Sequence, residues 1–255
     1  MPHSRPGHHA PVQRRPVGVE AIDDVLDEAI GRRHRLDPVI GRTAGPAGNA
    51  QLTAWTGLLL LALAAVELVT LIDVRGLLSW HVVVGVLLVA VAALKIASAG
   101  WRFLRYYGRS RPYRQAGPPP LLLRLLGPLV VLATVAVLGT GLWLIAVGPE
   151  SGRTTLVTLL GRRIDLLSLH QASFLLFAVA AGLHLLARFV PAVVLATERG
   201  HRDRRLRGRG PRIAVLVVAL VAGALAAALI LPAAAPWRDE QHGFPGGPPP
   251  GFHHR

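Results

Sequence analysis

The chain has 255 residues, of which 52% are hydrophobic, and a formal net charge of +14 at pH 7. This apolar content, with a mean hydropathy of +0.45, is atypical of a soluble domain of this size and predicts a membrane protein. Because the sequence has no cysteine, structural disulfides, thiolate-held iron–sulfur clusters and covalently attached haem are excluded.

Residues 1–53 form a polar segment rich in proline and arginine, without a short apolar stretch followed by a small-residue cleavage site. We therefore expect no cleavable signal peptide, and the first apolar span then acts as the insertion signal. Residues 17–30 predict a short amphipathic helix. This helix either docks on a protein partner or on the chain's own basic loops, or it is marginal and frays. Its apolar stripe consists of Val19, Ile22, Val25, Leu26 and Ile30.

Five aliphatic stretches are long enough to cross a membrane, since a helix needs about 20 residues to span the hydrocarbon core. They cover residues 54–73, 77–99, 121–147, 166–191 and 212–232. The predicted fold class is therefore all-α: a polytopic membrane helical bundle with a four-helix core over 54–191 and a fifth transmembrane helix over 212–232. Membrane lipid is the expected surrounding partner.

Arginines gather in two connections of the chain. Five follow the second span without any acid, and seven lie between residues 199 and 212, in and just after a basic loop over 192–211. Because short basic loops stay cytoplasmic, we predict a cytoplasmic N-terminus and an extracytoplasmic C-terminus. The same rule, with contact to anionic lipid, accounts for most of the positive charge, so nucleic acid is not a predicted partner.

Two further features concern the span ends and the C-terminus. Residues 233–255 are rich in proline, glycine, histidine and arginine, and we expect them to form a disordered extracytoplasmic tail. The five tryptophans lie near predicted span ends, where ring-bearing side chains anchor a helix at the interface. They are Trp55, Trp80, Trp101, Trp143 and Trp237.

A short repeat marks the second and fourth spans. LLSWH at 77–81 recurs as LLSLH at 166–170, which is 89 residues further along the chain. Both spans run inward under the predicted topology, so His81 and His170 lie at matching depth, about one turn below the outer surface, and can face each other. Fourteen residues later Lys95 and His184 are level again, about 21 Å further in and on nearly the same helical faces.

Ionisable groups inside a span cost at least about 2.5 kcal/mol each, so they usually have a partner and a function. Two imidazoles supply only half of the four ligands of a usual zinc site, whereas haem brings four nitrogens and needs one axial side chain on each side. Small residues suit the faces of a porphyrin, and Gly85 lies one turn below His81. Gly139 and Gly141 in the third span lie at this depth, and so does Glu67 in the first. The Glu67 carboxylate is placed to accept an imidazole N–H.

This pattern resembles the membrane b-type cytochromes, in which parallel helices each present two histidines separated by thirteen residues. The nearest likeness is to bacterial four-helix cytochromes b, including the haem subunits of formate dehydrogenase and nickel–iron hydrogenase, and to ferric-reductase-like domains. The resemblance covers roughly residues 54–191 and implies a multi-pass protein of the bacterial plasma membrane that transfers electrons. It further implies that His81 and His170 ligate the iron of an outer haem b and that His184 ligates an inner one. The chain departs from the pattern at Lys95, where the family's fourth histidine would stand.

The residues leave several alternatives open. The histidines can be simple interface residues without any haem. Lys95 can snorkel to the inner headgroups, pair with a haem propionate, a quinone oxygen or a proton route, or ligate iron as a neutral amine. The chain as a whole can be a non-haem membrane scaffold or a small proton-coupled transporter.

No catalytic acid–base pair, nucleophile or nucleotide-binding loop is evident in the sequence. We therefore expect an electron carrier or the membrane subunit of a redox enzyme, with one haem or two. A quinone or a redox protein is then the expected partner.

Overall fold

The computed structural model describes residues 44–116, 121–197 and 208–242, together with residues 37–41 and five positions between 23 and 30. Within this part of the chain, five helices are long and apolar enough to cross a membrane. They are α2 (Gly45–Thr70), α3 (Leu78–Tyr107), α5 (Leu121–Gly152), α6 (Leu166–Ala196) and α7 (Arg209–Ile230). The predicted all-α membrane bundle is therefore confirmed.

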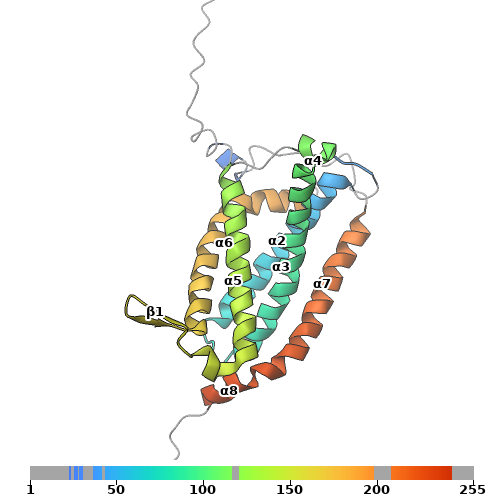
Figure 1. The fold of residues 1–255 in the computed structure, drawn as a ribbon. Coiled ribbons are helices and arrows are strands. Elements are labelled where there is room, and N and C mark those ends of the chain that lie inside the picture. Colours follow the sequence, from blue (N-terminus) through green and yellow to red (C-terminus); the bar gives the residue numbers. More distant parts are fainter. Residues whose placement is uncertain are drawn as a thin grey trace, which may run out of the picture.

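Four of these helices form a closed ring around a common axis. Helix α2 packs against α3 and α6, and α5 packs against the same two helices, so α3 and α6 occupy opposite corners. Figure 1 shows that α3 and α6 run in the same direction, beginning at the lower end of the bundle. We call this lower end, where His81 and His170 lie in the first turns of α3 and α6, the histidine end.

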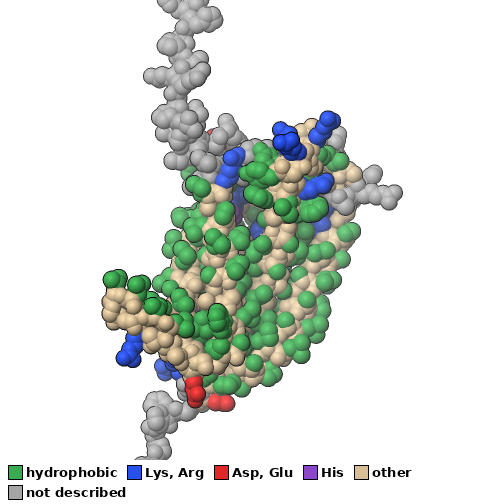
Figure 2. Space-filling model, in the orientation of Figure 1, with side chains coloured by type: hydrophobic (Ala, Val, Ile, Leu, Met, Phe, Trp, Pro, Cys, Tyr) green, Lys and Arg blue, Asp and Glu red, His purple; other side chains and the backbone are tan. Residues whose placement is uncertain are grey.

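The opposite end of the bundle is basic. Helix α3 ends there with Arg105 in its last turn, and the short helix α4 (Arg111–Gln115) follows. Figure 2 shows Lys and Arg side chains gathered at this end and hydrophobic side chains along the flanks of the helices. We call it the basic end.

Helix α2 begins nearer the N-terminus than the predicted span, which started at residue 54. Its first turns include Gln51, which is buried, and Asn49, whose side chain bonds to α3. Polar side chains used in helix packing lower the hydropathy of this stretch, so the predicted span begins later in the sequence than the helix does.

Helix α7 lies on the outside of the ring against α3. The two helices approach closely at Gly223, where a Cβ atom would come within 3.1 Å of Ala90 and 3.2 Å of Leu87. A glycine at this crossing lets the backbones meet, as small residues do in membrane helix pairs.

The chain does not become irregular after residue 232, which differs from the prediction of a disordered tail from 233. A 3₁₀ turn, η2 (Leu231–Ala234), leads into a short helix, α8 (Ala235–His242), beneath the histidine end. Trp237 of α8 is 8% exposed and donates its indole N–H to the Leu144 carbonyl at 2.9 Å. This buried anchor orders a segment whose composition alone favours disorder. Residues 243–255 lie outside the described residues.

The connection between α5 and α6 contains a hairpin of β1 (Val157–Leu159) and β2 (Arg162–Ile164). Leu160 and Gly161 form its two-residue turn, both with positive φ, 50° and 76°. Two such residues in sequence are the geometry of a type I′ turn, which matches the twist of a hairpin.

Most of the amphipathic helix predicted over 17–30 lies outside the described residues. Of the segment, Asp23, Leu26, Asp27 and Ala29 are helical and Ile30 is in a turn. The central part of the basic loop predicted over 192–211 also lies outside them.

Candidate functional site

His81 and His170 face each other across the bundle axis at the histidine end. Their ring centroids are 6.3 Å apart and the ring planes are nearly perpendicular, at 84°. They come from opposite corners of the ring, because α3 and α6 are not neighbours in it. The structure therefore brings together the two residues that the LLSWH and LLSLH repeat singled out.

The imidazole of His81 is held through Nδ1 by two side chains of α2. Glu67 Oε1 lies 2.9 Å from this nitrogen and Thr70 Oγ1 lies 3.1 Å from it. The Thr70 hydroxyl donates its own proton to the Glu67 carbonyl at 2.6 Å, so its oxygen accepts from the ring. Both neighbours are thus acceptors, which places a proton on Nδ1 and leaves the Nε2 lone pair available.

The imidazole of His170 is held in the same way by α5. Thr140 Oγ1 lies 3.1 Å from its Nδ1, and the Thr140 hydroxyl donates to the Ala136 carbonyl at 2.7 Å. The oxygen therefore accepts from the Nδ1 proton, and Nε2 is again the nitrogen with the free lone pair. Two histidines from different helices share one tautomer because each meets an acceptor on a neighbouring helix.

A glycine on α5 makes room for the second ring. A Cβ atom at Gly141 would lie 3.1 Å from Cε1 of His170. At Gly85 the nearest atom to such a Cβ would be Glu67 Oε1, at 3.6 Å, and at Gly139 nothing lies within 4 Å. Of the three glycines that we predicted at the depth of the histidine pair, Gly141 has the tightest surroundings and lies against the ring of His170.

The spacing of the two rings suits a shared metal between them. A nitrogen about 2 Å from an ion on each side places the two ring centroids about 6 Å apart, close to the observed separation. No group of three or more His, Cys, Asp or Glu side chains that could hold a metal ion occurs among the described residues.

An apolar cluster closes the histidine end. Leu144 of α5, Leu166 of α6 and Trp237 of α8 are its buried members. Arg238 of α8 also donates to Ser79, two residues before His81, at 3.4 Å. The cluster and α8 thus lie about one turn outside the histidine pair. Leu78, Val147 and Leu167 pack around this cluster.

Deeper toward the basic end, Lys95 and His184 do not form a second pair of this kind. The Lys95 ammonium donates a short hydrogen bond to the Thr53 carbonyl of α2, beside Gly57. His184 is within electrostatic range of Lys95 and of Arg188, and its buried Nδ1 has no hydrogen-bond partner among the described residues. The lysine therefore turns toward α2 instead of snorkelling to the headgroups.

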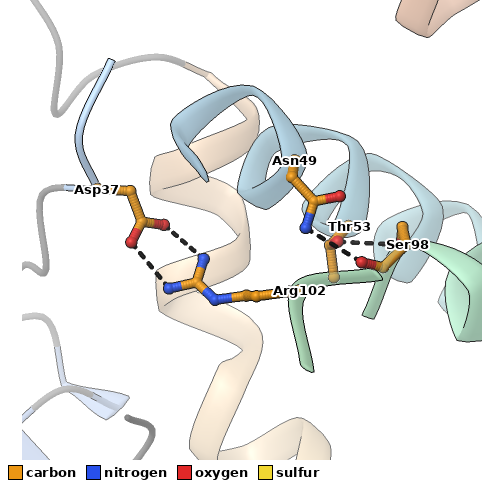
Figure 3. A network of polar contacts seen from close by, with 5 residues as sticks. All are labelled: Asp37, Asn49, Thr53, Ser98 and Arg102. Carbon is orange, nitrogen blue, oxygen red and sulfur yellow. Dashed lines mark hydrogen bonds and ion pairs between the residues drawn. The ribbon is translucent and has the colours of Figure 1, made fainter. Parts of the chain in front are cut away.

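Polar contacts join α3 to α2 and to the segment before α2 near the basic end, as Figure 3 shows. Asn49 donates to the Ser98 carbonyl at 3.1 Å, and the hydroxyls of Thr53 and Ser98 are 3.0 Å apart. Arg102 makes a bidentate ion pair with the buried Asp37, at 2.7 and 2.8 Å. This network ties the segment before α2 to α3 and fixes the depth of Lys95.

Sequence reasoning missed Thr70 and Thr140, which hold the two rings. A signal was present, since Thr70 lies three residues after Glu67 and Thr140 lies between Gly139 and Gly141. A threonine within a span usually bonds only to its own helix, however, so its type alone does not show that its oxygen also accepts from another side chain.

In comparisons with protein-family models, with curated proteins and with solved structures, nothing matched this chain.

Proposed function

We propose that the chain is a transmembrane b-type cytochrome that transfers electrons and holds one haem between α3 and α6. The observation that carries the proposal is the His81 and His170 pair: two imidazoles at 6.3 Å, each with Nδ1 held by an acceptor on a neighbouring helix. Ligating histidines in metalloproteins usually donate their other ring N–H in this way.

The residues present fit a haem at this depth. His81 and His170 would hold the haem iron, and Glu67, Thr70 and Thr140 would orient the two imidazoles and raise their basicity. When bound, the haem supplies one-electron redox chemistry. The carboxylate of Glu67 additionally places a negative charge beside one ligand, which favours a more positive centre.

The residues at the depth of Lys95 and His184 favour a single haem per chain, the one at the histidine end. Among the described residues only His184 offers an imidazole there, and the Lys95 ammonium donates to a backbone carbonyl. Lys95 and His184 can instead meet a quinone oxygen, since both bear or offer protons. A quinone or a redox protein would then exchange electrons with the haem.

The orientation belongs to the same proposal. The arginines of α3 and α4, with the seven between residues 199 and 212 of the sequence, favour a cytoplasmic basic end in a bacterial plasma membrane. The histidine end, with α8 and the hairpin, would then face outward.

A reduced-minus-oxidised visible spectrum of the purified protein tests the proposal. We expect the sharp bands of a low-spin b-type haem. A colourless protein expressed with sufficient haem would contradict the proposal and favour a non-haem scaffold or a proton-coupled transporter. In that alternative the Glu67 and His81 contact joins two helices without a cofactor.

A further inference from the structure

The hairpin between α5 and α6 carries an apolar surface that no other part of the described chain covers. Its exposed hydrophobic side chains are consecutive or nearly so, and Leu160 at the turn is 95% exposed. They are Leu156, Val157, Leu159 and Leu160. A cluster of this kind on a tip indicates contact with something outside the chain.

The position of the hairpin indicates what that contact is. In Figure 1 the hairpin projects sideways from the histidine end, and its tip turns back along the bundle to lie higher than the end of α5. In this place its apolar surface continues the lipid-facing flank of the helices. Figure 2 shows the hydrophobic side chains of the hairpin on the side toward the middle of the bundle and basic ones on the opposite side.

The turn itself favours the same interpretation. Leu160 has a φ of 50°, in the left-handed region where asparagine, aspartate or glycine is the usual choice at this position of a type I′ turn. A leucine is conformationally unfavourable there and makes no compensating contact with the described residues, since it is almost fully exposed. Contact with lipid would offset that disadvantage.

We infer that the hairpin is a membrane anchor. The apolar tip, with Leu160 at its centre, inserts into the leaflet at the histidine end, and Arg162 and Arg163 contact anionic headgroups. Both arginines are exposed and follow the tip directly, so their long side chains reach from the apolar layer to the phosphates. This inference is independent of the haem, because it rests on the membrane bundle alone.

The absence of cysteine from the sequence makes a direct test practical. The full chain with a single L160C substitution is labelled with a nitroxide and placed in nanodiscs that contain phosphatidylglycerol. Collision rates with oxygen and with a water-soluble nickel chelate then give the depth of the label. V218C, at an exposed position in the middle of α7, is the lipid reference, and S151C, at the end of α5, is the aqueous reference.

We expect the label at position 160 to resemble that at 218, with a high oxygen and a low nickel collision rate. A label that resembles position 151 would overturn the inference and leave the tip free for a soluble partner. V157C provides a second position in case L160C misfolds. In a background with R162Q and R163Q the label should move outward, and an unchanged depth would overturn the role of the two arginines.

Discussion

The ionisable side chains of α3 and α6 have different neighbours at the two ends of the bundle. At the histidine end, α3 and α6 each present an imidazole, and acceptors on α2 and α5 hold both in one tautomer. Fourteen residues further along, α3 presents Lys95, which donates to a carbonyl of α2, and α6 presents His184, whose Nδ1 has no partner in the described part of the chain. We call His81 and His170 the matched pair, and we call the depth of Lys95 and His184 the unmatched end.

The difference teaches what a short repeat can and cannot specify. The repeat places two residues at equal depth on parallel helices, which is sufficient for a pair when both residues are histidine. Whether the pair can ligate depends on neighbours outside the repeat, such as Glu67 and Thr140 on the flanking helices. At the inner depth the described neighbours supply a backbone carbonyl to Lys95 and no hydrogen-bond partner to the buried His184 Nδ1.

The largest expected effect is at the pair itself. His81→Ala or His170→Ala, each alone, should abolish the low-spin haem spectrum, because a bis-imidazole iron loses its spin state with either ligand. His184→Ala is the matched control at the unmatched end and should keep that spectrum. A visible spectrum of each purified variant decides the comparison, and an unchanged spectrum in either of the first two would refute the assignment.

The sequence was sufficient for the bundle and for the pair because both depend on spacing. Aliphatic runs set the spans, and equal offsets on parallel helices set His81 against His170. Depth alone also led us to expect Glu67 beside an imidazole, and the structure has this contact.

Other features depend on contacts between distant segments, which spacing does not show. Trp237 is buried because Leu144 on α5 offers a carbonyl 93 positions away in the chain. Lys95 turns toward α2 because Gly57 leaves space beside the Thr53 carbonyl. Local composition therefore could not predict that α8 is helical or that Lys95 points toward α2.

Removal of one holding hydroxyl should weaken the matched pair without destroying it. Thr140→Val keeps the shape of the side chain but leaves the Nδ1 proton of His170 without its oxygen. Loss of such a neighbour typically costs about 10-fold to 100-fold in metal affinity. We expect haem to be lost to apomyoglobin correspondingly faster.

Thr134→Val is the matched control on the same helix. Thr134 donates to the Val130 carbonyl as Thr140 does to Ala136, and no hydrogen bond from it to a histidine occurs in the described part of the chain. Equal haem loss from the two variants would show that Thr140 acts through helix stability alone.

The next smaller effect is on haem content, when the unmatched end receives a second histidine. Lys95→His supplies a second imidazole at the inner depth and removes a buried charge. Haem content by the pyridine haemochrome assay should rise from one per chain toward two. Two haems in the unaltered protein would contradict the contrast between the ends, and one haem in both proteins would mean that position 95 does not face His184.

A change of charge beside one ligand should be smaller still. Glu67→Gln keeps an acceptor near Nδ1 of His81 but removes the negative charge that favours the oxidised, more positive centre. We expect the haem to be retained and its midpoint potential to rise in a redox titration. An identical potential would show that the carboxylate does not act on the iron.

The smallest expected effect lies within the histidine end, where the two helices begin differently. Asp165 caps α6 by accepting from the Ser168 N–H at 2.7 Å, whereas α3 begins without a side-chain cap. The hydrogen bonds from the Ser168 side chain and backbone lower the pKa of Asp165 from 3.8. The carboxylate therefore stabilises the fold fully above that pH, and this contribution is lost as the pH falls through the lowered pKa. Asp165→Ala should cost about 1 kcal/mol near neutral pH, and Asp165→Asn only part of that, since asparagine keeps the accepting oxygen but not the charge. Thermal unfolding followed by circular dichroism should show the wild-type advantage over Asp165→Ala shrinking below about pH 4. A gap that does not change with pH would mean that the cap acts through its shape and not through its charge.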